Sequence, residues 1–320
     1  MNKYSFLNCE DDAVWDNLIA SSINKNIFCT SLFLKSLEKK VKRFLIKNNK
    51  EIIGGIILND DHKELNLNNE LLYTPLIFKE FGLRPRASLN NEKFYLIDSL
   101  KNFLINNFQK ISFISDYHLD DLRPFFFHNF DKKNNFFKIT KVNYTSIVNL
   151  DEIDNSNFEK TTFFSNLAVR IRQDYRYSLT KNKFKIIRNF QKENFERLIE
   201  ETFKRQKIKP DFDHKKRSKI LETLSKDRKA KMYQTYEGNN VIAFSVFGYI
   251  KSHAIYLHGA RIKDDNKDYS LTYSILEAIK DLKKIGIKTL DLEGINSPRR
   301  GFNKIGYGGK IFPYYHIEGN

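Results

Sequence analysis

The chain has 320 residues, of which 41% are hydrophobic, so it can bury one large core or two medium ones, and its net charge is +16. Cys9 and Cys29 form no CxxC pair and no cysteine–histidine cluster, so the pattern supports neither a disulfide framework nor a metal site and fits a reducing cytoplasm. The N-terminus lacks an apolar signal core and the longest apolar runs have strand length, so we expect a soluble, cytoplasmic protein without a transmembrane segment.

Helices alternate with short strands in the first half of the chain. We predict helices at residues 12–20, 31–40 and 93–108, and strands at residues 43–47, 52–58, 71–75, 111–115 and 143–149. This alternation indicates a mixed α/β sheet. Residues 151–160 are acidic and asparagine-rich and show no periodicity, which places a domain boundary between residues 1–150 and residues 151–320.

The second half contains a three-strand meander between helices. We predict helices at residues 163–181, 193–205, 216–225 and 270–284, and strands at residues 184–188, 230–237, 241–250, 254–260, 288–293 and 310–316. Helices, antiparallel meander, helix and two closing strands follow the plan of a GNAT-type acyltransferase domain, and the first half shows a weaker version of it. We therefore expect an α/β fold of tandem GNAT-like domains, each a mixed, mostly antiparallel sheet flanked by helices.

The positive charge is concentrated in one part of the chain. Residues 1–150 carry a net charge of +4, whereas residues 151–320 carry +12. Residues 170–231 alone hold 21 basic and 9 acidic side chains. This segment is either a solvated helical face or a surface that binds the phosphates of a nucleotide, a coenzyme or RNA. The sequence leaves both interpretations open.

The end of the chain combines a buried strand with a basic turn. Leu290 and Leu292 alternate with Asp291 and Glu293, so a strand here places the leucines on one face and the carboxylates on the other. A turn then follows with Arg299, Arg300 and Lys304. Glycines in the turn allow positive backbone angles and the close approach of a ligand. The pattern is suited to chemistry on a charged substrate.

Four passages carry a resemblance to a known superfamily, in the order found there. They are Trp15 with the helix entry at 28–37, LDDLRPFFF from Leu119, NLAVRIRQDYRY from Asn166 and DLEGINSPRRGFNKIGYGGK from Asp291. The third resembles a basic helix of the type N-x-x-x-R-x-I-R, and the fourth resembles an ending of the type FKxxFGG. The chain thus resembles the FemABX-like superfamily, which comprises peptidoglycan-bridge aminoacyltransferases and envelope-polysaccharide relatives built from two GNAT-like domains.

Two departures from the superfamily pattern concern the substrates. Lys304, Gly308 and Gly309 match the ending, but Asn303 stands where an aromatic residue is usual. Residues 192–227 are too few for the helical hairpin that some users of aminoacyl-tRNA insert, and residues 261–273 lack the glycine of a tight coenzyme A loop. We therefore expect no tightly bound cofactor, and the acyl donor is either aminoacyl-tRNA or acyl-CoA.

The resemblance implies acyl or aminoacyl transfer to an amino group of a cell-envelope precursor. This acceptor would be a small molecule or a lipid- or nucleotide-linked compound, such as an amino sugar, a polysaccharide or a peptidoglycan peptide, and tRNA is a candidate partner. The first alternative is an ordinary acyl-CoA-dependent GNAT N-acetyltransferase. The second is a non-catalytic RNA-binding protein.

Residues for this chemistry gather on a pair of strands that we expect to splay apart, at residues 253–260 and 288–293. Asp291, Glu293 and His258 are candidate proton acceptors, and Lys304 is a candidate cation for negative charge that develops during the reaction. Tyr256 is expected to share a face with His258. The remaining substrate-binding candidates are Arg172 and Arg176, one helical turn apart as a diphosphate clamp, and Tyr73, Arg300, Tyr307 and Gly308.

Overall fold

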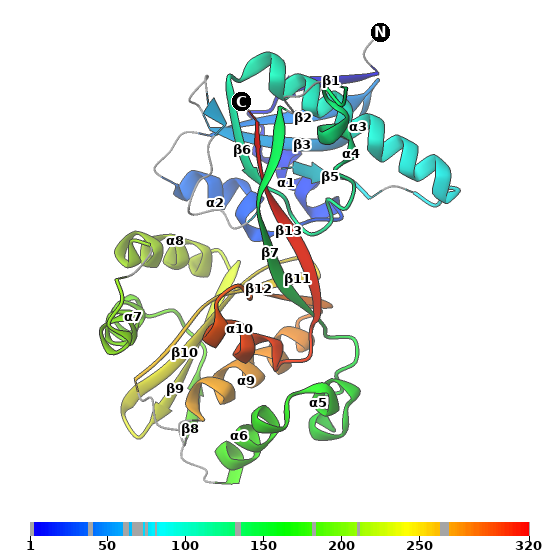
Figure 1. Cartoon of the computed structure of the whole chain (residues 1–320). Coiled ribbons are helices and arrows are strands. Elements are labelled where there is room, and N and C mark those ends of the chain that lie inside the picture. The colour runs from blue at the N-terminus through cyan, green and yellow to red at the C-terminus, as the bar shows by residue number, and fades with distance from the viewer. Residues whose placement is uncertain are drawn as a thin grey trace. The chain divides into compact units, whose positions relative to one another are not determined.

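The protein, described here from a computed structural model, forms two compact units (Figure 1). The structure describes residues 3–37, 41–59, 64–65, 73, 76–80, 82–131, 136–180, 184–209, 212–262 and 269–319. The first unit comprises Met1–Tyr144 and Phe312–Asn320, and the second comprises Thr145–Ile311. Strands β7 (Phe137–Asn149) and β13 (Lys310–Gly319) therefore contribute residues to both units.

The first unit contains a four-stranded antiparallel sheet in the order β1-β2-β3-β5. Its strands are β1 (Tyr4–Asn8), β2 (Val41–Asn48), β3 (Glu51–Asn59) and β5 (Leu76–Phe78). In addition, β4 (Glu64–Leu65) pairs in parallel with β6 (Lys110–Ile114), which pairs antiparallel with β13. The helices are α1 (Asp12–Ser21), η1 (Ile27–Cys29), α2 (Ser31–Ser36), α3 (Arg86–Asn107) and α4 (Arg123–Phe127). Leu96, Leu100 and Leu104, spaced by one helical turn, bury one face of α3 in the core.

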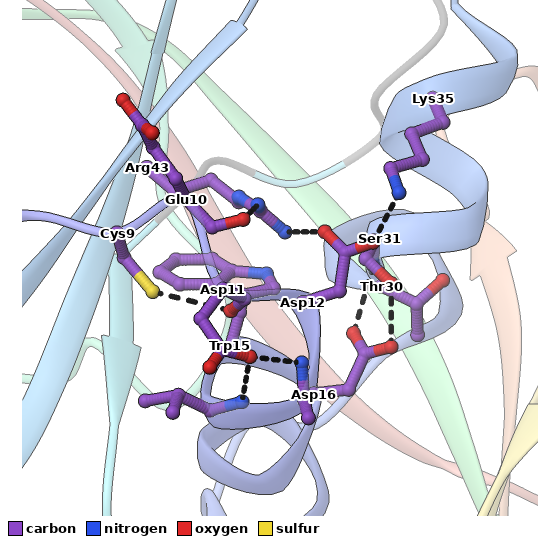
Figure 2. Close-up of polar contacts among 12 residues, drawn as sticks. Cys9, Glu10, Asp11, Asp12, Trp15, Asp16, Thr30, Ser31, Lys35 and Arg43 are labelled. Atoms are coloured by element: carbon purple, nitrogen blue, oxygen red, sulfur yellow. Dashed lines mark hydrogen bonds and ion pairs between the residues drawn. The ribbon is translucent and has the colours of Figure 1, made fainter.

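Polar side chains fix the start of α1 in the first unit (Figure 2). Asp11 is the N-cap, and its carboxylate accepts hydrogen bonds from two backbone N–H groups of the first turn. Trp15 is fully buried and donates its indole N–H to the carbonyl of Cys29. Asp12 forms ion pairs with Lys35 and with Arg43, and these cations lower the pKa of its carboxyl group. This network is structural and lies outside the candidate site.

The second unit is built on a mixed sheet in the order β7-β12-β11-β10-β9-β8. The strands are β8 (Phe184–Ile187), β9 (Ala230–Glu237), β10 (Asn240–Ile250), β11 (His253–Arg261) and β12 (Thr289–Gly294), together with the end of β7. The helices are η2 (Phe158–Lys160), α5 (Thr162–Asn166), α6 (Val169–Thr180), α7 (Lys192–Gln206), α8 (His214–Lys226), α9 (Ser270–Lys284) and α10 (Pro298–Ile305). The β9-β10-β11 meander is antiparallel, whereas β11 and β12 are parallel.

The two faces of the meander are covered by different helices (Figure 1). Phe244 contacts Phe195 of α7, with the ring centroids 5.3 Å apart. Phe247, which follows Phe244 by three residues on β10, belongs to the core cluster that contains Ile275 and Ile279 of α9. Because side chains alternate along a strand, α7 and α9 cover opposite faces. A residue's position along β11 therefore decides which helix it meets.

Most predicted elements are confirmed, and the tandem GNAT-like α/β fold with them. Some expectations about elements were wrong in detail, and others fall on residues outside the described part. The helix expected at 163–181 is two helices, α5 and α6, and the basic turn after residue 297 is the helix α10. The helix expected at 31–40 ends at Ser36, and residues 38–40 lie outside the described part. The strand expected at 71–75 also lies outside it except for Tyr73, and a described strand begins at Leu76.

The predicted boundary at residue 150 differs from the division into compact units, since β7 crosses into the second unit at Thr145 and residues 312–320 return to the first. The assignment of two GNAT-like domains to residues 1–150 and 151–320 stays a prediction. Among the described residues, no helix combines the length and apolar composition needed to cross a bilayer.

Candidate functional site

Strands β11 and β12 separate within the second unit. They pair in parallel only from His253 opposite Thr289 to Ile255 opposite Asp291. Beyond that point β11 continues to Arg261, while β12 follows β7 until Gly294 lies opposite Thr145. The backbone of β11 after Ile255 thus has no partner strand in β12. The expected splayed pair is present, and it offers backbone N–H groups to a donor in the opening.

A β-bulge at Leu257 changes the faces to which the β11 side chains point. Val246 of β10 lies opposite His258, but the next residue, Phe247, lies opposite Tyr256, so Leu257 is the extra residue. Tyr256 packs against Phe247 in the core beneath α9. His258 contacts Phe195 of α7, with ring centroids 5.5 Å apart. The expectation that Tyr256 and His258 share a face was wrong, because the bulge shifts the alternation by one residue.

Lys304 lies on α10 at the mouth of this opening. Its Nζ atom is 3.4 Å from Oε2 of Glu293 and 3.3 Å from the carbonyl oxygen of Gly294. The same ammonium group lies 5.3 Å from the ring centroid of Tyr256, a cation–π contact. Because the side chain is only 16% exposed, its charge acts in a partly dry environment.

Asp291 and Glu293 have different surroundings although they are two residues apart. Asp291 is fully buried and accepts hydrogen bonds from the hydroxyl of Thr145 and the backbone N–H of Glu293. Glu293 adopts a left-handed conformation with φ of 63°, and its half-buried carboxylate faces Lys304. The geometry indicates that Asp291 holds the bend of β12, while Glu293 is the carboxylate that reaches the opening.

The Tyr256 side chain lies along the backbone of its own strand. A Cβ atom added at Gly259 would be 1.9 Å from the Tyr256 hydroxyl oxygen, so only glycine leaves room for that hydroxyl. Burial, Tyr307 and Glu293 raise the pKa of Tyr256 well above its usual value. The hydroxyl group therefore stays protonated at neutral pH and can act as a hydrogen-bond donor.

Tyr307 and Gly308 connect α10 to the rest of the unit. Tyr307 is 1% exposed, and burial raises the pKa of its phenol. Gly308 has a φ of 76°, and a Cβ atom there would be 2.9 Å from the carbonyl oxygen of Asn166 at the end of α5. Gly308 thus lies against the end of α5, and Tyr307 is part of the core of the second unit, so that both residues fix the segment that follows Lys304.

His258 is held in the neutral form. Nη1 of Arg217, on α8, lies 3.2 Å from Nε2 of His258, and the Phe212 ring lies 5.1 Å from the imidazole. Burial, Arg217 and Lys304 lower the pKa of His258 well below its usual value. Since a guanidinium group only donates, Nε2 must accept and the ring proton sits on Nδ1. While Arg217 occupies Nε2, that nitrogen is not available to a substrate.

The remaining candidates differ in their burial and in their partners. Arg176 pairs with Glu159 at 2.8 Å, whereas Arg172 is half-buried with its Nε atom buried and unpaired. The two arginines on α6 therefore have different surroundings, and their joint role as a diphosphate clamp stays a prediction. Arg300 is exposed, and Tyr73 belongs to the first unit, where it is 2% exposed and packs edge-on against Tyr314.

Sequence reasoning missed two partners of the site, Arg217 and Thr145. They lie 41 and 146 residues away from His258 and Asp291, respectively. Arg217 is one of many cations in the basic segment, and Thr145 is one polar residue of a long strand, so no local pattern distinguishes either. No three histidine, cysteine, aspartate or glutamate side chains gather in a metal-binding arrangement within the described ranges.

The splayed β11–β12 pair, the bulge and the flanking helices are the features of a GNAT-like fold. The structure is similar to that of FemX, with a TM-score of 0.68 and 13% identity over 97% of this chain and 96% of that one. It is also similar to L-PGS from Bacillus licheniformis, with a TM-score of 0.53 and 11% identity over 97% and 92% of the two chains.

A third similar structure is a tandem GNAT protein from the clavulanic acid biosynthesis pathway. Its TM-score is 0.54, with 9% identity over 98% of this chain and 97% of that one. No protein-family model matches the sequence, and no curated protein is detectably similar to it. At such low identities the likeness establishes the shared fold over the whole chain.

Proposed function

We propose that this protein is a cytoplasmic acyltransferase that transfers an acyl or aminoacyl group to an amino group of a cell-envelope precursor. The observation that carries the proposal is the opening between β11 and β12 with the ammonium group of Lys304 at its mouth. The resemblance to the FemABX-like superfamily and the similarity to FemX and L-PGS support the envelope acceptor.

In this proposal the residues of the opening divide the chemistry among them. The acceptor amine attacks the carbonyl carbon of the donor, and a tetrahedral oxyanion forms. The free N–H groups of β11 and the Lys304 ammonium group stabilise that charge. Glu293, the carboxylate nearest to Lys304, accepts the proton that the amine loses. The leaving thiol or ribose oxygen takes up the proton that Glu293 accepted, and the neutral hydroxyl of Tyr256 is the candidate hydrogen-bond donor to that leaving atom.

Aminoacyl-tRNA and acyl-CoA remain alternative donors in this proposal. Of residues 261–273, the stretch that would contact a coenzyme pyrophosphate, residues 263–268 lie outside the described part. A thermal-shift titration with acetyl-CoA, compared with salt-sensitive binding of charged tRNA, distinguishes the two. Mass spectrometry of the envelope-precursor pool with and without the protein would identify donor and acceptor together.

Replacement of Lys304 tests the proposal. We expect Lys304→Ala to lower turnover roughly 100- to 1,000-fold, because one preorganised charge at the oxyanion is worth that much. Lys283→Ala is the matched control, since Lys283 is also a half-buried lysine paired with a carboxylate, 3.1 Å from Asp151, but lies on α9. Equal turnover in the two variants would remove Lys304 from the mechanism. If neither the native protein nor the control variant transferred an acyl group to any envelope amine, the proposal that the protein is an enzyme would be refuted.

A further inference from the structure

The corner where α7 meets α8 carries a group of lysines, which we call the lysine corner. It consists of Lys204, Lys207, Ile208, Lys209, Lys215 and Lys219, all exposed. None of the five ammonium groups has a carboxylate partner among the residues that the structure describes. Two lysines further along the same helices are instead neutralised, Lys192 by Glu196 and Lys226 by Glu222. Five unneutralised cations of the basic segment thus lie at the end of α7, in the connection and in the first half of α8.

The backbone at the end of α7 shows that a lysine is placed there against conformational preference. Lys207 has a φ of 53°, and its N–H and that of Ile208 close the helix on the carbonyls of Lys204 and Phe203. Glycine usually occupies this left-handed position, because a Cβ atom strains it. A basic side chain near a helix C-terminus is favourable, but Lys204 already supplies one within the regular helix.

Ile208 gives the corner an apolar tip. It lies between Lys207 and Lys209 and is 44% exposed, although the residue after such a left-handed cap commonly packs back on its helix. Phe212, in the connection between α7 and α8, does not offer a comparable apolar tip. Its ring packs edge-on against Phe203, and the Arg217 guanidinium lies 5.4 Å from its centroid.

We propose that the lysine corner docks the protein on an anionic phospholipid bilayer. Clustered lysines are attracted to the negative surface of such a membrane, and an apolar residue among them can enter the boundary of headgroups and acyl chains. Single-stranded nucleic acid fits less well, because its binding relies on aromatic rings free to stack on bases. The inference goes beyond the proposed function and stands without it, since it concerns association with a surface and no transfer step.

Vesicle co-sedimentation with the full chain tests the proposal. We expect binding to vesicles of phosphatidylcholine mixed with phosphatidylglycerol, no binding to phosphatidylcholine alone, and weaker binding as salt rises toward about 0.15 M. The variant Lys204→Gln/Lys209→Gln/Lys215→Gln should bind roughly 100-fold more weakly, at about fivefold per lysine. The control Lys192→Gln/Lys226→Gln removes paired lysines from the same helices and should bind like the native protein.

Lys207→Gly separates the surface role from folding. Glycine relieves the left-handed strain, so this variant should melt at a higher temperature while it binds anionic vesicles about fivefold more weakly. Equal binding to both vesicle types would overturn the proposal, as would equal binding by the triple variant and its control. Tight binding of a short single-stranded RNA that the triple variant loses, without vesicle binding, would assign the corner to nucleic acid and also overturn it.

Discussion

At the scale of single residues, Asp291 illustrates how a candidate proton acceptor can have another task. It is fully buried, and its carboxylate accepts from Thr145 and from the backbone of Glu293. We expect Asp291→Ala to lower the free energy of unfolding by about 2–4 kcal/mol, because it removes two hydrogen bonds to the buried side chain and leaves the backbone N–H of Glu293 without its acceptor. Asp291→Asn, which keeps an acceptor, should lose about 1 kcal/mol.

Urea unfolding followed by circular dichroism measures these values. Thr145→Val tests the hydrogen bond between Thr145 and Asp291. The double variant with Asp291→Ala should lose less free energy of unfolding than the sum of the losses in the two single variants. A loss of turnover in Asp291→Asn without a change in stability would contradict the positional role and favour proton transfer by this residue.

The lowered pKa of His258 predicts how the stability of the fold depends on pH. Its pKa is lowered in the folded state, so between that value and its usual value near 6.5 the unfolded chain binds a proton that the folded chain does not. The stability that this group contributes is therefore present above pH 6.5 or so and is lost as the pH falls, by at most about 1.4 kcal/mol per pH unit.

The difference between native protein and His258→Gln isolates this contribution from other titrating groups. Below about pH 6.5, the free energy of unfolding measured with urea should fall more steeply with decreasing pH in the native protein than in His258→Gln. Arg217→Gln should raise the pKa of His258 and so reduce the slope. Parallel curves for native protein and His258→Gln would show that His258 titrates normally in the fold.

At the scale of elements, the packing of β11 depends on Gly259, which leaves room for the side chain of Tyr256 on the same strand. Gly259→Ala would place a Cβ atom 1.9 Å from the Tyr256 hydroxyl, so the tyrosine must move or the strand must shift. We expect a loss of about 1–3 kcal/mol of stability, the usual effect of overpacking. Tyr256→Phe removes the hydroxyl oxygen, so the double variant should recover part of that loss. Thermal unfolding of the four proteins measures the recovery, and strict additivity would contradict the contact.

The element α10 shows a limit of sequence patterns. Pro298 favours a helix start, but the glycines at 301 and 306 suggested a turn. In the fold, a Cβ atom at Gly301 would be 2.2 Å from the carbonyl oxygen of Ile295, so this glycine serves close packing. The bulge at Leu257 likewise has no signature in the sequence, since it depends on the register between β10 and β11.

At the scale of the whole molecule, the division into units predicts which fragments fold. Residues 145–149 supply the part of β7 that pairs with β12, and Thr145 supplies the hydrogen bond to Asp291. We expect a fragment of residues 145–311 to unfold cooperatively in urea. A fragment of residues 151–311 should not, because β12 loses its neighbour and the buried Asp291 carboxylate loses its hydroxyl donor. Equal stability of the two would favour the boundary predicted at residue 150.

The sequence by itself determined most of the helices and strands and the tandem GNAT-like fold, because hydrophobic periodicity and turn residues are local properties of the chain. It did not give the strand at Tyr4–Asn8 or the helix at Pro298–Ile305. It also pointed to Lys304 and Glu293, which the fold brings within 3.4 Å of each other. Only the tertiary structure decided that Asp291 is enclosed, that Tyr256 and His258 face opposite helices, and that Arg217 holds His258 neutral. These outcomes depend on strand register and on contacts between residues far apart in the chain, and neither leaves a local pattern.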